Sequence, residues 1–317
     1  MRVISAWRNL LPVLLLPAWT AAAGSLAWAQ PAMSADTPIE QVIVTAPKLP
    51  EEIKNFVQSY ATRSLAGDGV ISRWKNGVCP ATFGFADTHD NEFVTLRIRQ
   101  IAALVGAPVA ETPCGINIHV YFSAEPQQLL DGIRGHGGAR LLTATPSKSK
   151  QIAVINKPIQ AWYATGTRTE HDGVLTFDDN DDNGWSGCVC DIGPPANGPG
   201  VRVLDFDSNR ANLRSELAHV YVIADVKQTS RYRFTAVADF IAMLSLSEIR
   251  ISSTCQDLPS ITYLIVPDCD ARLKPDQATD SDLAFLKGIY SVDPGEALRN
   301  QQNDIAAEMA KELEGRN

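Results

Sequence analysis

The residues best suited to chemistry form a run of acidic and amide side chains near the middle of the chain. Asp179, Asp181 and Asn183 occupy alternate positions before Gly184, which fits the D-x-[DN]-x-[DN]-G opening of a calcium-binding loop. Oxygen ligands at this spacing converge on one hard cation, and the glycine permits the sharp turn. The twelfth position, where such a loop has a bidentate glutamate, is Cys190. The sequence therefore predicts either an incomplete calcium site or a solvated acidic turn.

Histidines are the second group of side chains that could act, as zinc ligands. The chain has no His-Glu-x-x-His motif, and its five histidines are spread along it: His89, His119, His136, His171 and His219. A catalytic zinc needs three protein ligands brought together. Glu216 and His219 are three residues apart on an expected strand, where they would point to opposite faces. We therefore expect no zinc site.

The motifs typical of nucleophilic catalysis and of nucleotide binding are absent from the sequence. The segment Gly184-Trp185-Ser186-Gly187 misses the Gly-x-Ser-x-Gly nucleophile motif by one residue. There is no phosphate-binding loop and no dinucleotide fingerprint. Serine, histidine and aspartate are all present, as in most proteins, but no spacing joins them into a triad. The motifs therefore predict no catalytic residue and no cofactor, apart from the calcium considered above.

The six cysteines predict disulfide bonds. They are an even number, and six cysteines allow 15 connectivities. The most economical pairing has no crossing loops and consists of Cys79–Cys114, Cys188–Cys190 and Cys255–Cys269. The pair Cys188–Cys190 would close a very small, strained ring, which is either structural or reducible.

The N-terminus predicts export into a compartment that permits disulfides. Two arginines precede the apolar run Leu10–Leu26, and Ala27-Trp28-Ala29 places small residues at the −3 and −1 positions before Gln30. These are the three regions of a secretory signal peptide. An uncleaved anchor helix is the alternative, which the two prolines of the run disfavour. We expect cleavage after Ala29 and a periplasmic or secreted mature protein.

Charge excludes two classes of partner. The 317-residue chain carries 28 basic and 36 acidic side chains, for a formal net charge of −8. A nucleic-acid binder needs a basic face, and anionic lipids attract basic segments. No apolar stretch after the leader is long enough to span a bilayer. We therefore expect no nucleic acid and no transmembrane segment after cleavage, and a small ligand or an envelope protein as the partner.

Hydrophobic spacing predicts helices interspersed with short strands. Residues 30–50 are expected to form a flexible arm and residues 51–317 a single domain. Helical periodicity and caps predict helices at 51–66, 88–105, 126–134, 236–249, 280–290 and 295–314. Extended segments are expected at 70–74, 116–122, 159–169, 201–206 and 218–226, and a long exposed loop or a loop hairpin at 172–200. Without regular βαβ alternation, this order predicts one α+β domain stapled by disulfides.

Two predictions concern which side chains are buried. The helix at 88–105 is expected to bury a stripe made of Phe93, Leu96, Ile101, Leu104 and Val105. Trp162 lies on an alternating strand and is expected in the core. Trp185 lies in a polar loop, which makes it a candidate contact residue.

Three short segments carry a resemblance to known proteins: Trp74-Lys75-Asn76-Gly77-Val78-Cys79-Pro80, Asp239–Leu246 and Asp280–Tyr290. Together they resemble an uncharacterised family of exported proteobacterial proteins, over most of Ile71–Tyr290. The last segment also resembles the helix that follows the active site in metzincin-like secreted proteins, where the preceding helix carries the zinc histidines. Here the preceding helix has Asp239, Met243 and Ser247 but no histidine. The resemblance therefore implies a zincin-like C-terminal half without a metal site.

The expected function is a non-catalytic binding or interaction module of the cell envelope. The first alternative is a peptidase-like hydrolase with a non-standard active site, for which activity that depends on Asp239 or Glu248 would be the evidence. The second alternative is a calcium-stabilised secreted protein that uses Asp179, Asp181 and Asn183.

Overall fold

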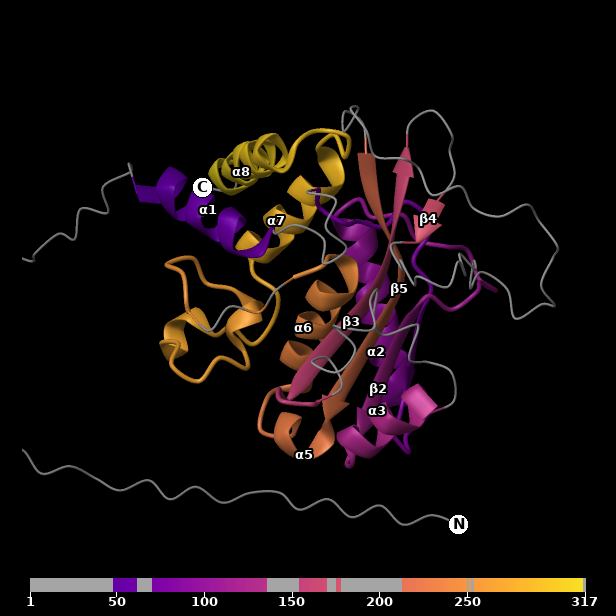
Figure 1. Ribbon diagram of the computed structural model, residues 1–317. Helices are drawn as coiled ribbons and strands as arrows, with labels where there is room; N and C mark the ends of the chain where they lie inside the picture. The colour runs from indigo at the N-terminus through magenta and orange to yellow at the C-terminus, as the bar shows by residue number, and fades with distance from the viewer. Residues whose placement is uncertain are drawn as a thin grey trace, which may run out of the picture. The chain divides into compact units, whose positions relative to one another are not determined.

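A five-stranded mixed sheet organises the part of the chain that the computed structural model describes, namely residues 48–61, 70–135, 154–169, 175–177, 213–249, 251 and 254–315 (Figure 1). The strands are β1 (Pro80–Phe83), β2 (Ile118–Ser123), β3 (Ile159–Thr169), β4 (Leu175–Phe177) and β5 (Leu213–Asp225). Their spatial order is β1-β2-β5-β3-β4. The first three in this order run parallel, whereas β3 runs antiparallel to both β5 and β4.

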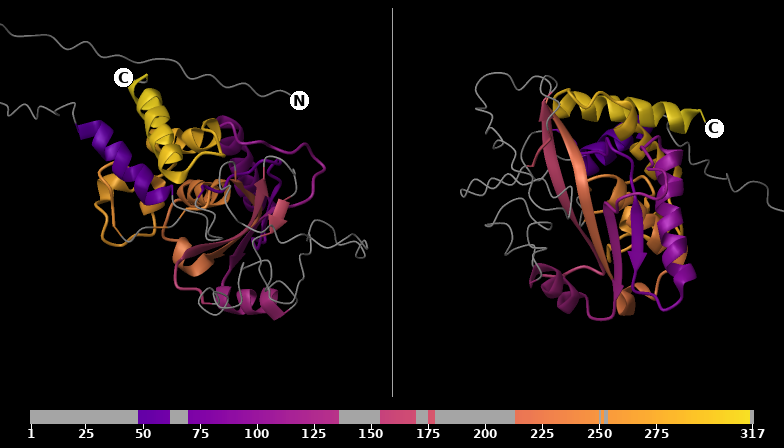
Figure 2. Two further views of the ribbon diagram at one scale, coloured as in Figure 1. Left: turned by 45° about the horizontal axis from the view of Figure 1, so that its top comes forward. Right: turned by 90° about the vertical axis from the view of Figure 1, so that its right-hand side faces the viewer.

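Helices cover both faces of the sheet. The helices α2 (Thr88–Leu104) and α6 (Phe234–Leu246) lie on one face, and α3 (Pro126–Gly135) lies on the other (Figure 2). The helices α1 (Lys48–Tyr60), α7 (Asp280–Ser291) and α8 (Leu298–Glu314) pack together, and α7 also contacts α6. The short helix α5 (Val226–Thr229) follows β5, and two 3₁₀ turns, η2 (Ile261–Tyr263) and η3 (Ala271–Leu273), lie between α6 and α7.

The larger core lies between the sheet and the α2–α6 layer. On β2 the side chains of Ile118, Val120 and Phe122 are buried while those between them are half-buried, as expected of alternating strand residues. Every residue of Ala236–Leu246 in α6 is buried. A helix that is hydrophobic all round belongs inside a protein. A smaller cluster on the opposite face contains Leu130 of α3 together with Trp162, Tyr221 and Ile223.

The predicted α+β class is confirmed, and most predicted elements are present. The strand predicted at 159–169 is β3, with the same bounds, and the buried position of Trp162 is confirmed. The helix predicted from residue 51 begins at Lys48, inside the predicted arm, and ends at Tyr60. It can include Pro50 because a proline in the first turn of a helix removes no intrahelical hydrogen bond.

The predicted buried stripe of α2 is largely wrong. Phe93, Leu96 and Leu104 are 39%, 47% and 56% exposed. The residues that α2 does bury are Val94, Ile98, Ile101 and Ala102. The helix carries two interleaved apolar sets, and its contacts with α6 and β1 decide which set enters the core. Helical spacing alone does not distinguish them.

Three short segments differ from the strand predictions. The strand predicted at 218–226 is β5, which begins earlier, at Leu213, and the strand predicted at 201–206 lies outside the described residues. The segment predicted as a strand at 70–74 forms a single parallel bridge, between Arg73 and Glu216. The four-residue strand β1 was not predicted, so the parallel β1–α2–β2 crossover was missed as well. Within the segment predicted as a long loop or a loop hairpin, at 172–200, the strand β4 pairs antiparallel with β3. Each of these short segments is extended because of the strand beside it, a contact that local spacing does not report.

Two predicted disulfides are confirmed. Cys79–Cys114 joins the residue before β1 to the segment before β2, with 6.1 Å between the Cα atoms. Cys255–Cys269 closes a loop between α6 and α7, with a Cα separation of 5.6 Å. The predicted pair Cys188–Cys190 lies outside the described residues.

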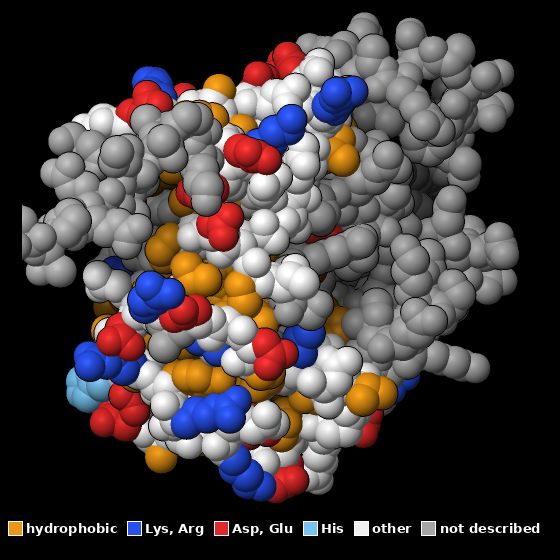
Figure 3. All heavy atoms as spheres, turned by 90° about the vertical axis from the view of Figure 1, so that its left-hand side faces the viewer, with side chains coloured by type: hydrophobic (Ala, Val, Ile, Leu, Met, Phe, Trp, Pro, Cys, Tyr) orange, Lys and Arg blue, Asp and Glu red, His pale blue; other side chains and the backbone are white. Residues whose placement is uncertain are grey.

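The described surface carries both signs of charge. Figure 3 shows one face of the molecule, on which Lys and Arg side chains lie beside Asp and Glu side chains. Among the described residues, one such ion pair joins Lys287 of α7 to Glu312 of α8 at 2.7 Å. None of the helices in the described part of the chain has the length and apolarity that a bilayer span requires.

The turn after β1 depends on a glycine, and this can be tested by substitution. Gly84 has φ +116°, and a Cβ placed there would lie 2.0 Å from the carbonyl oxygen of Phe122 on β2. We expect Gly84→Ala to lower the free energy of unfolding, measured by urea denaturation, by more than Gly106→Ala does. Gly106 also has a positive φ, +79°, but its Cβ would meet open space. Its replacement should therefore cost only the backbone strain, about 1–2 kcal/mol. Equal losses would show that the close approach to Phe122 is unimportant.

Candidate functional site

The residues that the sequence predicts for calcium lie outside the described part of the chain. These are Asp179, Asp181 and Asn183. His136, His171 and the candidate contact residue Trp185 lie outside it as well. Within the described residues, no group of three or more His, Cys, Asp and Glu side chains is placed to hold a metal ion.

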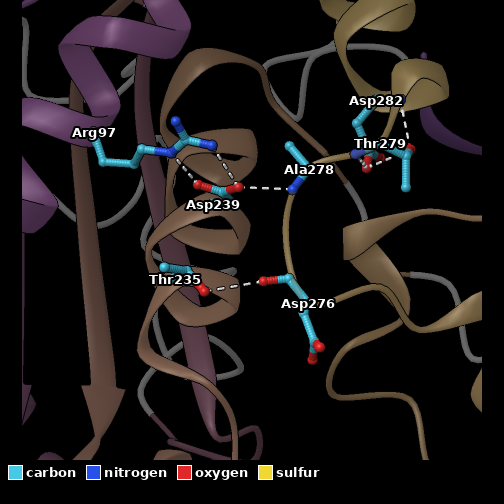
Figure 4. Close-up of polar contacts among 7 residues, drawn as sticks. All are labelled: Arg97, Thr235, Asp239, Asp276, Ala278, Thr279 and Asp282. Carbon is cyan, nitrogen blue, oxygen red and sulfur yellow. Dashed lines mark hydrogen bonds and ion pairs between the residues drawn. The ribbon is translucent and has the colours of Figure 1, made fainter.

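Asp239, one of the two carboxylates considered for a hydrolase, is held in a buried ion pair (Figure 4). Its Oδ1 accepts a hydrogen bond from Arg97 Nε at 2.5 Å, and its Oδ2 accepts one from Arg97 Nη2 at 2.9 Å. The backbone N–H of Ala278 also donates to Oδ2, at 2.7 Å. The pKa of Arg97 is raised by this hydrogen bonding to Asp239. The carboxylate, whose side chain is fully buried, therefore links α6 to α2 and to the segment before α7.

Glu248, the second carboxylate considered, is also buried. Its Oε2 accepts a hydrogen bond from Ser72 Oγ at 2.9 Å, and the hydroxyls of Ser72 and Ser215 lie 2.9 Å apart. Both serines are at most 1% exposed. A substrate cannot reach a hydroxyl in this position, so the cluster connects the segment before β1 to β5 and to the residues after α6.

A charged cavity is the most distinctive site among the described residues. It has a volume of about 360 Å³ and lies where the start of β5, residues 73–75, the turn after α2 and the α7–α8 connection meet. Its lining includes four charged side chains, those of Arg73, Lys75, Arg214 and Glu216, and also contains Trp74, Gly106, Pro108, Ser215, Tyr290, Val292 and Pro294. Three of its charged groups are cationic and one is anionic. We call this site the basic cavity.

Arg73 is the unusual member of the basic cavity because it is only 7% exposed. Its Nη1 donates to the carbonyl oxygen of Val292 at 2.7 Å, and its Nη2 donates to Gln301 Oε1 at 2.9 Å. Both acceptors are uncharged. Among the described residues, Nε has no hydrogen-bond partner and the guanidinium has no carboxylate in ion-pair contact. Burial lowers its pKa to about 10, so Arg73 stays cationic at neutral pH.

The charged residues of the basic cavity are positioned by two adjacent extended segments. Arg73 bridges Glu216 in parallel register, with the N–H of Leu217 donating to the Arg73 carbonyl at 3.0 Å. Residues two apart on an extended segment share a face. Arg73 and Lys75 therefore lie on one face of the first segment, and Arg214 and Glu216 lie on one face of the second. Lys75 Nζ lies 3.7 Å from Glu216 Oε1, whose side chain is 4% exposed. The i, i+2 charge spacing was visible in the sequence, but the pairing of the two segments was not.

A β-bulge corrects the prediction for Glu216 and His219. On β3, Ala164 pairs with His219 and Gly166 pairs with Glu216, so the register shifts by one residue near Thr165. Partners of residues two apart on one strand lie on the same face. The two side chains are therefore on one face of β5, and the prediction of opposite faces was wrong because an extra residue on β5 could not be read from the spacing.

The structure brings two of the scattered histidines together. The rings of His119 on β2 and His219 on β5 lie 6.0 Å apart, and the ring of His119 stacks on that of Tyr221 at 4.6 Å. Burial, followed by the nearby His219, lowers the pKa of His119 to about 4. Burial also lowers the pKa of His219, whose Nδ1 has no hydrogen-bond partner among the described residues. Both imidazoles are therefore neutral at pH 7 and pack as aromatic rings.

Comparison with known proteins does not assign the chain to a family. The chain matches no protein-family model, no curated protein and no solved structure. The function of the chain is therefore inferred from its own sites.

The role of Asp239 predicts a loss of stability when its charge is removed. Asp239→Asn keeps the shape of the side chain but leaves Arg97 facing a neutral amide. Breaking a buried ion pair costs about 3–5 kcal/mol, and we expect the lower end of this range because the Arg97 side chain is 32% exposed. Urea unfolding followed by circular dichroism measures the change. Asp276→Asn is the control, because its ion pair with Arg233 is exposed and contributes at most about 1 kcal/mol. Equal unfolding midpoints for the Asp239 variant and the wild type would contradict this role.

The half-buried position of His119 beside His219 predicts a dependence of stability on pH. Its pKa is about 4 in the folded protein and 6.5 ordinarily, so folding favours the neutral ring. The resulting stabilisation is complete above pH 6.5 and is lost as the pH falls towards 4. Between these values, the melting temperature of a His119→Gln variant should therefore fall less than that of the wild type. His89→Gln is the control, because His89 is exposed on α2. Parallel melting curves for the wild type and the His119 variant would show that His119 does not carry this dependence.

Proposed function

We propose that the chain is an exported, non-catalytic binding module of the cell envelope, and that the basic cavity holds a small carboxylate- or phosphate-bearing ligand. The observation that carries the proposal is the buried guanidinium of Arg73, which has only uncharged acceptors among the described residues. A buried charge is costly unless an opposite charge or several hydrogen bonds compensate it. An anionic ligand would add a direct opposite charge to the two hydrogen bonds and the electrostatic interaction with Asp293 that Arg73 has.

The composition of the basic cavity supports an anion as the ligand. Arg73, Lys75 and Arg214 contribute three positive charges, and Glu216 contributes one negative charge. Arginine presents a planar set of donors that matches carboxylate and phosphate groups. The volume of about 360 Å³ lies within the range of small-molecule sites. Trp74 and Tyr290 add apolar wall, which suits a ligand with an organic body.

Binding is favoured over hydrolysis by the positions of the candidate carboxylates. Asp239 is occupied by Arg97 and Ala278, and Glu248 is buried against Ser72. Export is supported by the leader of the sequence and by the two disulfides, which form in oxidising compartments.

Titration calorimetry on the mature, oxidised protein tests the proposal, with phosphate, acetate, succinate and citrate as probes. We expect at least one of these anions to bind, and Lys75→Gln and Arg214→Gln to weaken its binding about tenfold each, because each variant removes a charged donor. These variants are preferred to Arg73 variants, since Arg73 also supports the α7–α8 connection.

Lys274→Gln is the matched control, because Lys274 is a cation outside the cavity lining. Its binding constants should equal those of the wild type. The proposal is wrong if none of the four anions binds at millimolar concentration, or if both cavity variants bind them as tightly as the control does.

A further inference from the structure

The connections that follow β1 and β2 pass to opposite faces of the sheet. This divergence makes a topological switch point at the carboxyl ends of the two strands. The chain leaves β1 for α2, which packs into the larger core, and leaves β2 for α3, whose Leu130 packs into the core on the opposite face. The right-hand view of Figure 2 shows these two helices on opposite sides of the strands. In open sheets with parallel strands, ligands bind in the crevice outside the carboxyl ends of the strands, where neighbouring connections diverge in this way.

A groove lies at this edge, beside the end of β2. It has a volume of about 530 Å³ and is lined by Tyr121, Ser123, Glu125, Gln128, Leu129, Gly132 and Ile133. We call it the switch-point groove. Its lining comes from β2, the turn after it and one side of α3. It shares no residue with the basic cavity.

The switch-point groove has one aromatic residue in its lining, Tyr121, whose ring stacks on another ring outside the lining. The ring of Tyr121 stacks on that of Phe83 of β1, with 5.4 Å between the centroids. Phe83 is 42% exposed although it is a large hydrophobic residue. Burial raises the pKa of Tyr121, so its hydroxyl stays protonated and uncharged. The faces of aromatic rings attract cations, and Leu129 and Ile133 add apolar contact within the same lining.

The charge of the switch-point groove also favours a cationic ligand. Glu125 is the one charged residue in its lining. Glu125 already holds an ammonium group, because Lys227 Nζ of α5 donates to its Oε1 at 2.7 Å. The side chains of Glu125 and Lys227 are 68% and 65% exposed, and an ion pair this exposed contributes little to stability. Another ammonium can therefore replace that of Lys227 at small cost.

We propose that the switch-point groove binds a small organic cation with an apolar body, whose ammonium group pairs with Glu125 in place of Lys227. The body of the ligand lies along Tyr121, Leu129 and Ile133. Ser123 and Gln128 are placed to accept or donate hydrogen bonds to further polar groups of the ligand. This inference is independent of the anion proposed for the basic cavity, because the two sites differ in residues, charge and ligand.

Titration calorimetry with phenethylamine and its neutral analogue 2-phenylethanol tests the inference on the mature protein. We expect phenethylamine to bind about threefold more tightly than 2-phenylethanol, because only the amine pairs with the exposed carboxylate of Glu125. Glu125→Gln should abolish this preference. Lys227→Gln should tighten the binding of phenethylamine about threefold, because it removes the competing ammonium.

Asp131→Asn is the matched control, because Asp131 is an exposed carboxylate of α3 outside the lining of the groove. Phenethylamine should bind this variant as it binds the wild type. Four results would each overturn the inference: no binding of phenethylamine, equal binding of the neutral analogue, unchanged binding by the Glu125 variant, or weaker binding by the Lys227 variant. Since the variants are exposed and lie outside the basic cavity, none of these results bears on the anion site.

Discussion

The ion pair between Arg97 and Asp239 is the contact on which the arrangement of the helices depends. It joins α2, which connects β1 to β2, to α6, which backs the sheet, and Ala278 adds the segment before α7 (Figure 4). A buried carboxylate is tolerated only where donors surround it, and here three N–H groups do so. This geometry favours one relative position of the three segments. Since α7 leads into the Val292 and Gln301 contacts of Arg73, the shape of the basic cavity follows from the same interaction.

The two proposed ligand sites lie at opposite ends of β5. The basic cavity lies at the start of β5, near residues 214–216, whereas the switch-point groove lies beside Ser123, which pairs with the last residue of β5, Asp225. About nine residues of extended chain separate these levels, or roughly 30 Å. The basic cavity includes a segment that pairs with the start of β5 through Arg73 and Glu216. The switch-point groove lies where the connections after β1 and β2 diverge. Their opposite charges make simultaneous binding of an anion and a cation compatible with the fold.

The elements that were predicted correctly are those that residues close together in the sequence determine. The alternation in β3, the caps and apolar spacing of α7, and the pairs Cys79–Cys114 and Cys255–Cys269 all follow from neighbouring residues or simple loop closure. The missed features depend on contacts between distant segments. The extended conformation of β1 comes from β2, the bulge on β5 becomes visible only opposite β3, and Arg73 meets Gln301 across 228 positions. The residues of both candidate sites belong to this second group, and their types alone did not single them out.

The position of α1 has a consequence for the order in which the chain can fold. Its apolar face finds its partners near the other end of the sequence: Phe56 packs against Phe285 of α7, and Gln302 of α8 donates to the carbonyl oxygen of Ala61. Contacts between such distant residues can form only after the intervening chain is complete. The helix α1 therefore remains without these partners until α7 and α8 have been synthesised. A chain truncated before α7 would therefore leave the apolar face of α1 without these partners.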